Sequence, residues 1–167
     1  LGEVHKTLLP TYDVYDELRY FEPNNTFECI EFQGRKLGIT ICEDIWHNFE
    51  LQYLSYETNP VEELADLGAE AIFNLSASPY TKNKPDGRER MLRSNAVNLG
   101  LPVFYTNQVG ANTELISDGD SMVIDGEGQI IDRAPLFKEV FVDVLWGTDN
   151  SLKSIYSPNH KELPKIG

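Results

Sequence analysis

Three short apolar runs alternate with two helix-like segments in the middle of this 167-residue sequence, and that order limits the folds open to it. The apolar runs cover residues 36–41, 69–75 and 101–106 and have the length of buried strands. Between them, residues 60–67 and 87–98 have the pattern of helices that stop at glycines. The alternation favours an α/β fold in which helices pack on a sheet.

Turn signals on either side of this region predict hairpins, so we expect a mixed sheet. A glycine-bearing turn separates two β-rich runs at residues 26–33 and 36–41, and again at residues 121–125 and 129–132. Residues 3–9 and 140–144 are predicted as further strands, whereas residues 10–25 are typical of a loop with at most one helical turn.

The charge of the chain argues against two classes of partner. Lys and Arg number 14 against 27 Asp and Glu, which gives a net charge of −13. An acidic protein repels phosphate backbones and anionic lipid surfaces, so we expect neither nucleic acid nor a membrane as partner. With no apolar run of membrane-spanning length and no signal-like start, the expected location is cytoplasmic.

The two cysteines, Cys29 and Cys42, are too few for a disulfide scaffold and lack the neighbours of a structural zinc site, so no metal is expected. Cys29 lies in an alternating strand pattern, which favours a small buried side chain. Cys42 instead ends an apolar run and precedes Glu43 and Asp44, whose charges need water or polar partners. We therefore expect the strand to end in an elbow that exposes the Cys42 thiol.

A thiol in such an elbow becomes a nucleophile when a nearby cation favours its thiolate. Lys6, at the end of the predicted strand 3–9, is the cation candidate. The three histidines, His5, His47 and His160, are poorly placed for a Cys–His pair. A purely packing role for Cys42 remains the alternative.

Four stretches of the sequence resemble the successive signature blocks of the carbon–nitrogen hydrolase (nitrilase) superfamily, and more closely the glutaminase domains of glutamine-dependent NAD synthetases. The blocks are KTLLPTYDVYDELRYFEP, GITICEDIW, NLSASPYTKNK and YTNQVGANTELISDGDSMVIDGEG. The resemblance covers about residues 3–145, and its first two blocks are the specific ones. It implies a nitrilase-like α-β-β-α sandwich with mixed sheets, of which this chain lacks the N-terminal part.

The resemblance also implies a reaction. Cys42 would be the nucleophile and Lys6 the cation of a Glu-Lys-Cys triad that hydrolyses the side-chain amide of glutamine through a thioester. The glutamine contacts of the family match Tyr12, Ser78 and Lys84, with Glu43 nearby. On charge, Lys84 would bind the α-carboxylate and Glu43 the α-amino group.

Each of these residues also has a plainer interpretation. Tyr12 could be a packing aromatic in its loop, and Ser78 could cap the turn before Pro79. Lys84 and Arg88 could be solvated charges, and we expect Arg88 to be structural.

One member of the family pattern has no match here, because the triad glutamate precedes the lysine block and this sequence starts five residues before Lys6. We therefore expect residues 1–147 to be the C-terminal portion of a glutaminase domain, inactive alone, with residues 148–167 as a linker or tail toward an absent synthetase domain. Glu17 would be an accessory acid near Lys6. ATP and the NAD precursor are expected only in that other domain, so no cofactor is expected here.

Partners implied by the resemblance are glutamine, the chain's own synthetase domain and further copies of itself in a homo-oligomer. Two alternatives remain open. The chain could be a stand-alone amidase of the nitrilase superfamily, or a catalytically silent binding or assembly fragment that keeps the pocket without turnover.

Overall fold

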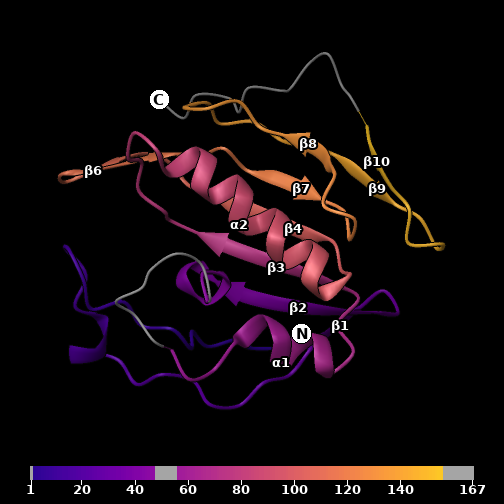
Figure 1. Cartoon of the computed structure of the whole chain (residues 1–167), viewed down its shortest axis with the longest axis horizontal. Helices are drawn as coiled ribbons and strands as arrows, with labels where there is room; N and C mark the ends of the chain where they lie inside the picture. Colours follow the sequence, from indigo (N-terminus) through magenta and orange to yellow (C-terminus); the bar gives the residue numbers. More distant parts are fainter. Residues whose placement is uncertain (1, 48–55, 156–167) are drawn as a thin grey trace.

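The computed structural model describes residues 2–47 and 56–155 and contains a six-stranded mixed sheet (Figure 1). Strands β2, β3 and β4 run parallel at its centre, and the outer pairs are antiparallel. This confirms the predicted mixed sheet. In spatial order the strands are β1 (Ile30–Phe32), β2 (Arg35–Ile41), β3 (Ala71–Ser76), β4 (Val103–Asn107), β7 (Met122–Ile124) and β8 (Ile130–Arg133).

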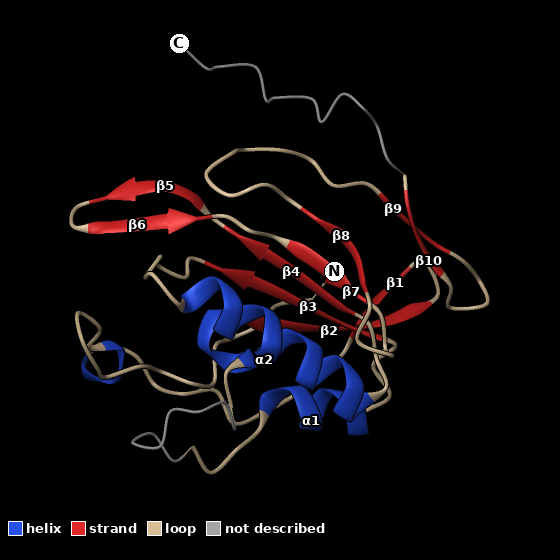
Figure 2. Ribbon diagram, turned by 45° about the horizontal axis from the view of Figure 1, so that its top comes forward, coloured by secondary structure: helices blue, strands red, loops and turns tan. Residues whose placement is uncertain are grey.

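Two helices, α1 (Pro60–Asp66) and α2 (Lys84–Leu99), cover one face of this sheet (Figure 2). Their apolar side chains pack on the central strands in one core, which includes Leu64, Met91 and Leu92 against Ile72 and Val103. Burial of such side chains is the main favourable contribution to folding. The main sheet thus carries one helical layer.

Local signals account for the ends of these elements. Gln33 and Gly34 have φ angles of 50° and 78°, as a two-residue type I′ hairpin turn between β1 and β2 requires. Helix α2 ends at Gly100 in the left-handed conformation, as predicted, but it begins at Lys84 and not at residue 87. Proline in its first turn explains the earlier start, because proline fits the first helical positions.

The predicted strand at residues 3–9 is wrong, since residues 2–11 form neither helix nor strand. The backbone N–H groups of Thr7 and Leu8 donate to the side chain of Asp44, so they are not available to a sheet ladder. The first hairpin strand is also shorter than residues 26–33. Apart from the 3₁₀ turn η1 (Glu17–Arg19), residues 10–25 are a loop, as predicted.

Residues 140–144 do not close the main sheet, which corrects a second prediction. Strand β9 (Val144–Trp146) pairs instead with β10 (Leu152–Ser154) in a separate two-stranded sheet, because alternation predicts a strand without specifying its partner. A projecting hairpin of β5 (Val109–Asn112) and β6 (Leu115–Asp118) was not predicted at all. β10 lies within the predicted linker 148–167, of which residues 156–167 are outside the described part.

In the part of the chain that the structure describes, no helix combines the length and the apolar character needed to cross a membrane.

Candidate active site

Cys42 lies where strand β2 ends, as the first residue of the 3₁₀ turn η2 (Cys42–Ile45). Its φ angle of 49° is in the left-handed region, which is rare for a residue with a side chain and often occurs at functional sites. The side chain is half-buried and lines two adjoining cavities. The predicted elbow with an accessible thiol is therefore present.

Asp44 connects this elbow to the segment that carries Lys6. One carboxylate oxygen accepts the backbone N–H groups of Thr7 and Leu8 at 3.0 and 2.7 Å, and the other accepts that of Ile41 at 3.0 Å. Burial raises the pKa of the Asp44 carboxyl, and the three N–H bonds act against that rise. Asp44 thus ties the residues next to Lys6 to the residue before Cys42.

Lys6 lines both of the cavities that Cys42 lines. Its ammonium contacts the Glu17 carboxylate at 2.5 Å, so Glu17 lies near Lys6 as predicted. The two cavities measure about 390 and 790 Å³, and Tyr15 and Glu17 also line both. Burial, followed by the charges of Cys42 and Glu43, raises the pKa of Tyr15 to about 12.

The smaller cavity is also lined by Glu43, which two tyrosines hold in place. The Tyr12 hydroxyl donates to both carboxylate oxygens at 3.0 and 2.9 Å, and the Tyr56 hydroxyl donates to one of them at 3.3 Å. Burial raises the pKa of Glu43, while the two hydroxyls and the charges of Lys6 and Lys84 oppose the rise.

Lys84 faces the same cavity from the first turn of α2. Its Nζ lies 5.6 Å from the centre of the Trp46 ring, and within the described residues it forms no ion pair. Burial and the nearby Arg88 lower the pKa of Lys84, and the charges of Cys42 and Glu43 oppose this. A cation in this position favours an anionic group of a ligand.

Ser78 is 1% exposed and completes this wall of the smaller cavity. Its hydroxyl has no hydrogen-bond partner among the described residues, while its backbone N–H donates to Asn107 at 2.8 Å. A turn-capping role for the hydroxyl is therefore not seen.

Comparisons with known proteins show the family of this chain. The model of the carbon-nitrogen hydrolase family matches residues 1–145. The chain belongs to this family. Among its relatives, a glutamine-dependent NAD(+) synthetase from Synechocystis sp. is 45% identical over 137 residues, which are 81% of this chain and 24% of that protein.

Solved structures of carbon-nitrogen hydrolases share its fold. A glutamine-dependent NAD+ synthetase from Acinetobacter baumannii matches with a TM-score of 0.80 and 37% identity, over 94% of this chain and 28% of that one. A carbon-nitrogen hydrolase from Helicobacter pylori matches with a TM-score of 0.68 and 25% identity, over 80% and 48%. The predicted nitrilase-like fold is confirmed. The chain spans about a quarter of the length of the curated relatives it matches.

In this carbon-nitrogen hydrolase, all six residues predicted for the site line the smaller cavity; their roles stay a prediction. They are Lys6, Tyr12, Cys42, Glu43, Ser78 and Lys84. Arg88 is fully buried, so its interpretation as a solvated charge is wrong. Cys29 is half-buried and packs against the core, as predicted for a structural residue. His160 lies outside the described residues.

Sequence reasoning missed Tyr56 and the bridging role of Asp44. Tyr56 belongs to no periodic pattern, so no local signal distinguishes it from other loop tyrosines. Asp44 was recognised as a charge that needs partners, but its partners lie 36 and 37 residues away in the sequence. That the protein binds no metal stays a prediction. Among the described residues, no group of three or more His, Cys, Asp or Glu is placed to hold an ion.

Proposed function

We propose that this chain is the glutaminase part of a glutamine-dependent NAD synthetase, which hydrolyses the glutamine side-chain amide to glutamate and ammonia. The observation that carries the proposal is the smaller cavity, where Cys42 shares the walls with the buried carboxylate of Glu43 and with Lys84, a cation that has no ion pair within residues 2–47 and 56–155. Glutamine presents a matching set of groups: an amide, an α-carboxylate and an α-ammonium. The 45% identity to a glutamine-dependent NAD(+) synthetase supports the same choice of substrate.

In the proposed complex, Lys84 pairs with the α-carboxylate and Glu43 with the α-ammonium group. Tyr12 holds the Glu43 carboxylate through both oxygens, so its direction is fixed before substrate arrives. This arrangement leaves the amide end of glutamine for Cys42 and Lys6. Preorganised partners of this kind reduce the cost of ordering a ligand on binding.

In the proposed reaction, the Cys42 sulfur attacks the amide carbon and the carbonyl oxygen becomes an oxyanion, which the Lys6 ammonium stabilises. The thiol proton passes to the triad glutamate that the family resemblance implies and then to the leaving nitrogen. The carbon–nitrogen bond breaks, ammonia departs and a thioester remains. Water attacks the thioester, which releases glutamate and restores the thiol. We expect the ammonia to serve ATP-dependent NAD synthesis in a synthetase domain.

The test is covalent capture of the thiol. A diazoketone analogue of glutamine alkylates a bound cysteine, with loss of dinitrogen and transfer of the thiol proton to the new methylene carbon. Mass spectrometry of the purified protein should find one adduct, on the peptide that contains Cys42, and excess glutamine should slow its formation. Cys42→Ala should abolish the adduct. Cys29→Ala is the matched control and should retain it, because burial raises the pKa of Cys29 and the sulfur faces the carbonyl of Leu64.

A wild-type protein that forms no adduct, or one whose labelling glutamine does not slow, would overturn the assignment and favour a silent module or an amidase of another substrate. Release of ammonia from glutamine, measured on the same preparation, separates turnover from mere capture.

A further inference from the structure

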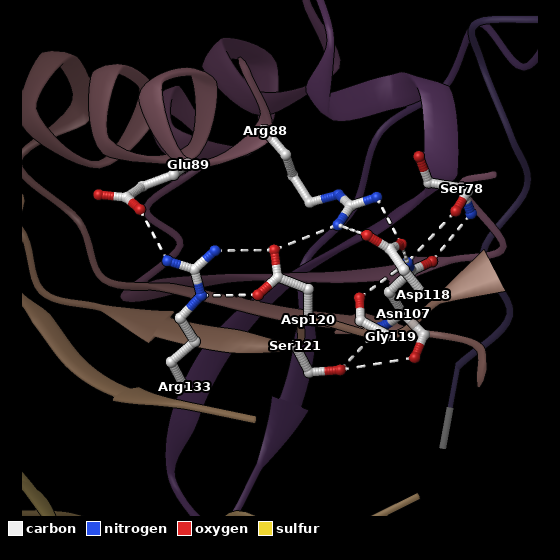
Figure 3. Close-up of polar contacts among 9 residues, drawn as sticks. All are labelled: Ser78, Arg88, Glu89, Asn107, Asp118, Gly119, Asp120, Ser121 and Arg133. Atoms are coloured by element: carbon white, nitrogen blue, oxygen red, sulfur yellow. Dashed lines mark hydrogen bonds and ion pairs between the residues drawn. The ribbon is translucent and has the colours of Figure 1, made fainter. Parts of the chain in front are cut away.

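A cluster of buried polar side chains lies next to Ser78, which lines the smaller cavity (Figure 3). One of them, Asn107, also lines the larger cavity. Asn107, at the end of β4, is 5% exposed, and Arg88, Asp118 and Asp120 are fully buried. None of these four residues was assigned a role in binding glutamine. Of the four, Asn107 bonds the backbone of Ser78, and the other three are linked to Asn107 through Asp118.

Asn107 holds Ser78 from both sides of its backbone. The Asn107 Oδ1 accepts the N–H of Ser78 at 2.8 Å, and its Nδ2 donates to the carbonyl oxygen of Ser78 at 3.3 Å. The same Nδ2 donates to the carbonyl of Gly119 at 2.8 Å and to the Asp118 carboxylate at 3.3 Å. The Ser78 N–H is a donor and must face the amide oxygen of Asn107, whereas the two carbonyls and the carboxylate are acceptors and must face its NH₂ group. Only one orientation of the Asn107 amide therefore satisfies all four bonds.

Charged groups behind Asn107 fix it in turn. Arg88 donates to both oxygens of Asp118 at 2.9 and 3.0 Å, a two-pronged pairing with little angular freedom. Asp120 receives a further bond from Arg88 at 3.3 Å and two from Arg133 at 2.6 and 3.0 Å. Movement of Asn107 would disturb paired charges in a buried environment, where an unpaired charge is costly.

The bonds from Asn107 go to the backbone of Ser78 and not to its side chain. The N–H and the carbonyl are occupied by Asn107, whereas the buried hydroxyl forms no hydrogen bond of normal geometry within the described residues. Burial raises the pKa of the nearby Tyr105, whose own hydroxyl also lacks a partner there, and the side chain of Ser78 is one of the groups that oppose this rise. In Figure 3 the hydroxyl points away from Asn107. A buried polar group without a partner is unfavourable, and a ligand in the cavity can supply the missing bond.

We propose that Asn107 is a positioning residue for substrate binding: it locks the backbone of Ser78 so that only the Ser78 hydroxyl addresses the ligand. Its effect is on recognition of the bound amino acid and not on the reactivity of Cys42. The proposal rests on the proposed glutaminase function, because glutamine is the ligand whose recognition Ser78 would serve.

The test is a double-mutant cycle with the diazoketone analogue of glutamine, made in a Cys29→Ala background so that only Cys42 is labelled. Asn107→Ala should raise the half-saturating concentration of the analogue about 3- to 10-fold, the value of one hydrogen bond. Ser78→Ala should have an effect of similar size. In the Ser78→Ala background, Asn107→Ala should add less than about twofold, because its effect passes through the missing hydroxyl.

Two controls separate positioning from general damage. Alkylation of Cys42 by iodoacetamide, which is too small to need Ser78, should change less than about twofold in Asn107→Ala. Ser121→Ala removes a hydroxyl that bonds the backbone of Asn107 at 3.0 Å without touching its side chain, and should leave the half-saturating concentration unchanged. If Asn107→Ala does not fold, Asn107→Ser replaces it, since its hydroxyl is too short to reach both backbone groups of Ser78.

Equal effects of Asn107→Ala in the two backgrounds would overturn the proposal, as would a parallel loss of iodoacetamide labelling. A half-saturating concentration of the analogue in Asn107→Ala that equals the wild-type value would also overturn it. If the wild-type protein shows no labelling that glutamine slows, the proposed function itself has failed, and this outcome is distinct from the other three.

Discussion

Replacing Arg88 by methionine should remove a large part of the stability of this protein. The guanidinium makes three bonds to carboxylates that are fully buried, two to Asp118 and one to Asp120. Burial alone would lower the pKa of Arg88, but the bonds and charges of Asp118 and Asp120 outweigh it and leave that pKa raised. The cation is therefore stabilised by the folded protein.

The size of the loss in unfolding free energy follows from the hydrogen bonds that each carboxylate still has after Arg88 is removed. Asp120 retains two bonds from Arg133, whereas the Asp118 carboxylate retains, within the described part of the chain, only the 3.3 Å bond from Asn107. The loss is thus one uncompensated buried charge, which costs about 3–5 kcal/mol. Methionine fills much of the space left by arginine, so the contribution of a cavity is small. Against a total of about 5–15 kcal/mol for a typical domain, such a loss is severe.

The assay is urea unfolding of the purified protein, with the slope m checked for constancy. In the variant the Asp118 carboxylate is left as the stranded charge. Adding Asp118→Asn should recover part of the loss at neutral pH. Arg19→Met, at an exposed ion pair with Asp16, is the control and should cost less than about 1 kcal/mol. A cost below about 1 kcal/mol for Arg88→Met, or no recovery when Asp118→Asn is added, would refute the reasoning.

Two further predictions concern binding and packing. Burial raises the pKa of Glu43, and in the proposed complex its ionised form pairs with the α-ammonium of glutamine. Glutamine affinity measured by calorimetry should therefore be full above that raised pKa and fall as the pH drops through it. Tyr12→Phe should move this fall in affinity to higher pH, because the Tyr12 hydroxyl lowers the pKa of Glu43, and Glu43→Gln should abolish it. A pH dependence that is unchanged in Glu43→Gln would show that another group causes it. Gly38→Ala should lower the unfolding free energy by about 1–2 kcal/mol in urea titrations, because its Cβ would lie 2.8 Å from Ile72 and 3.2 Å from Leu64; unchanged stability would show that the core relaxes around it.

Patterns that are local in the sequence predicted structure well here. Pro60 with a glycine stop gave helix α1, the turn at residues 33–34 gave the first hairpin, and the charges after Cys42 gave the elbow. Each of these rests on neighbours within a few positions, where backbone preferences decide. Cys42 and Lys6 were already candidates on these local grounds. The other four residues of the smaller cavity, Tyr12, Glu43, Ser78 and Lys84, came from family motifs, which carry information about distant contacts that propensity lacks.

Failures occurred where a distant partner decided the outcome. Residues 3–9 have a strand-like composition, but the Asp44 carboxylate takes the N–H groups that a ladder would need. Arg88 lies in a polar stretch and looks solvated, yet two aspartates 30 and 32 residues later draw it into the interior. In both cases the sequence shows the polar residues, and only the fold shows which of them meet.

The position of Lys6 relative to Cys42 follows from this dependence on distant polar bonds. No strand ladder holds the Lys6 segment; its backbone carbonyl accepts the N–H of Asn24, and its ammonium contacts Glu17. The strongest tie is Asp44, which bonds the two residues after Lys6 and lies two residues after Cys42 in the same 3₁₀ turn. A shift of the elbow therefore carries the Lys6 segment with it. The position of the Lys6 ammonium relative to the Cys42 thiol is therefore maintained by the buried Asp44 carboxylate, which bonds the segment of Lys6 and lies in the turn of Cys42.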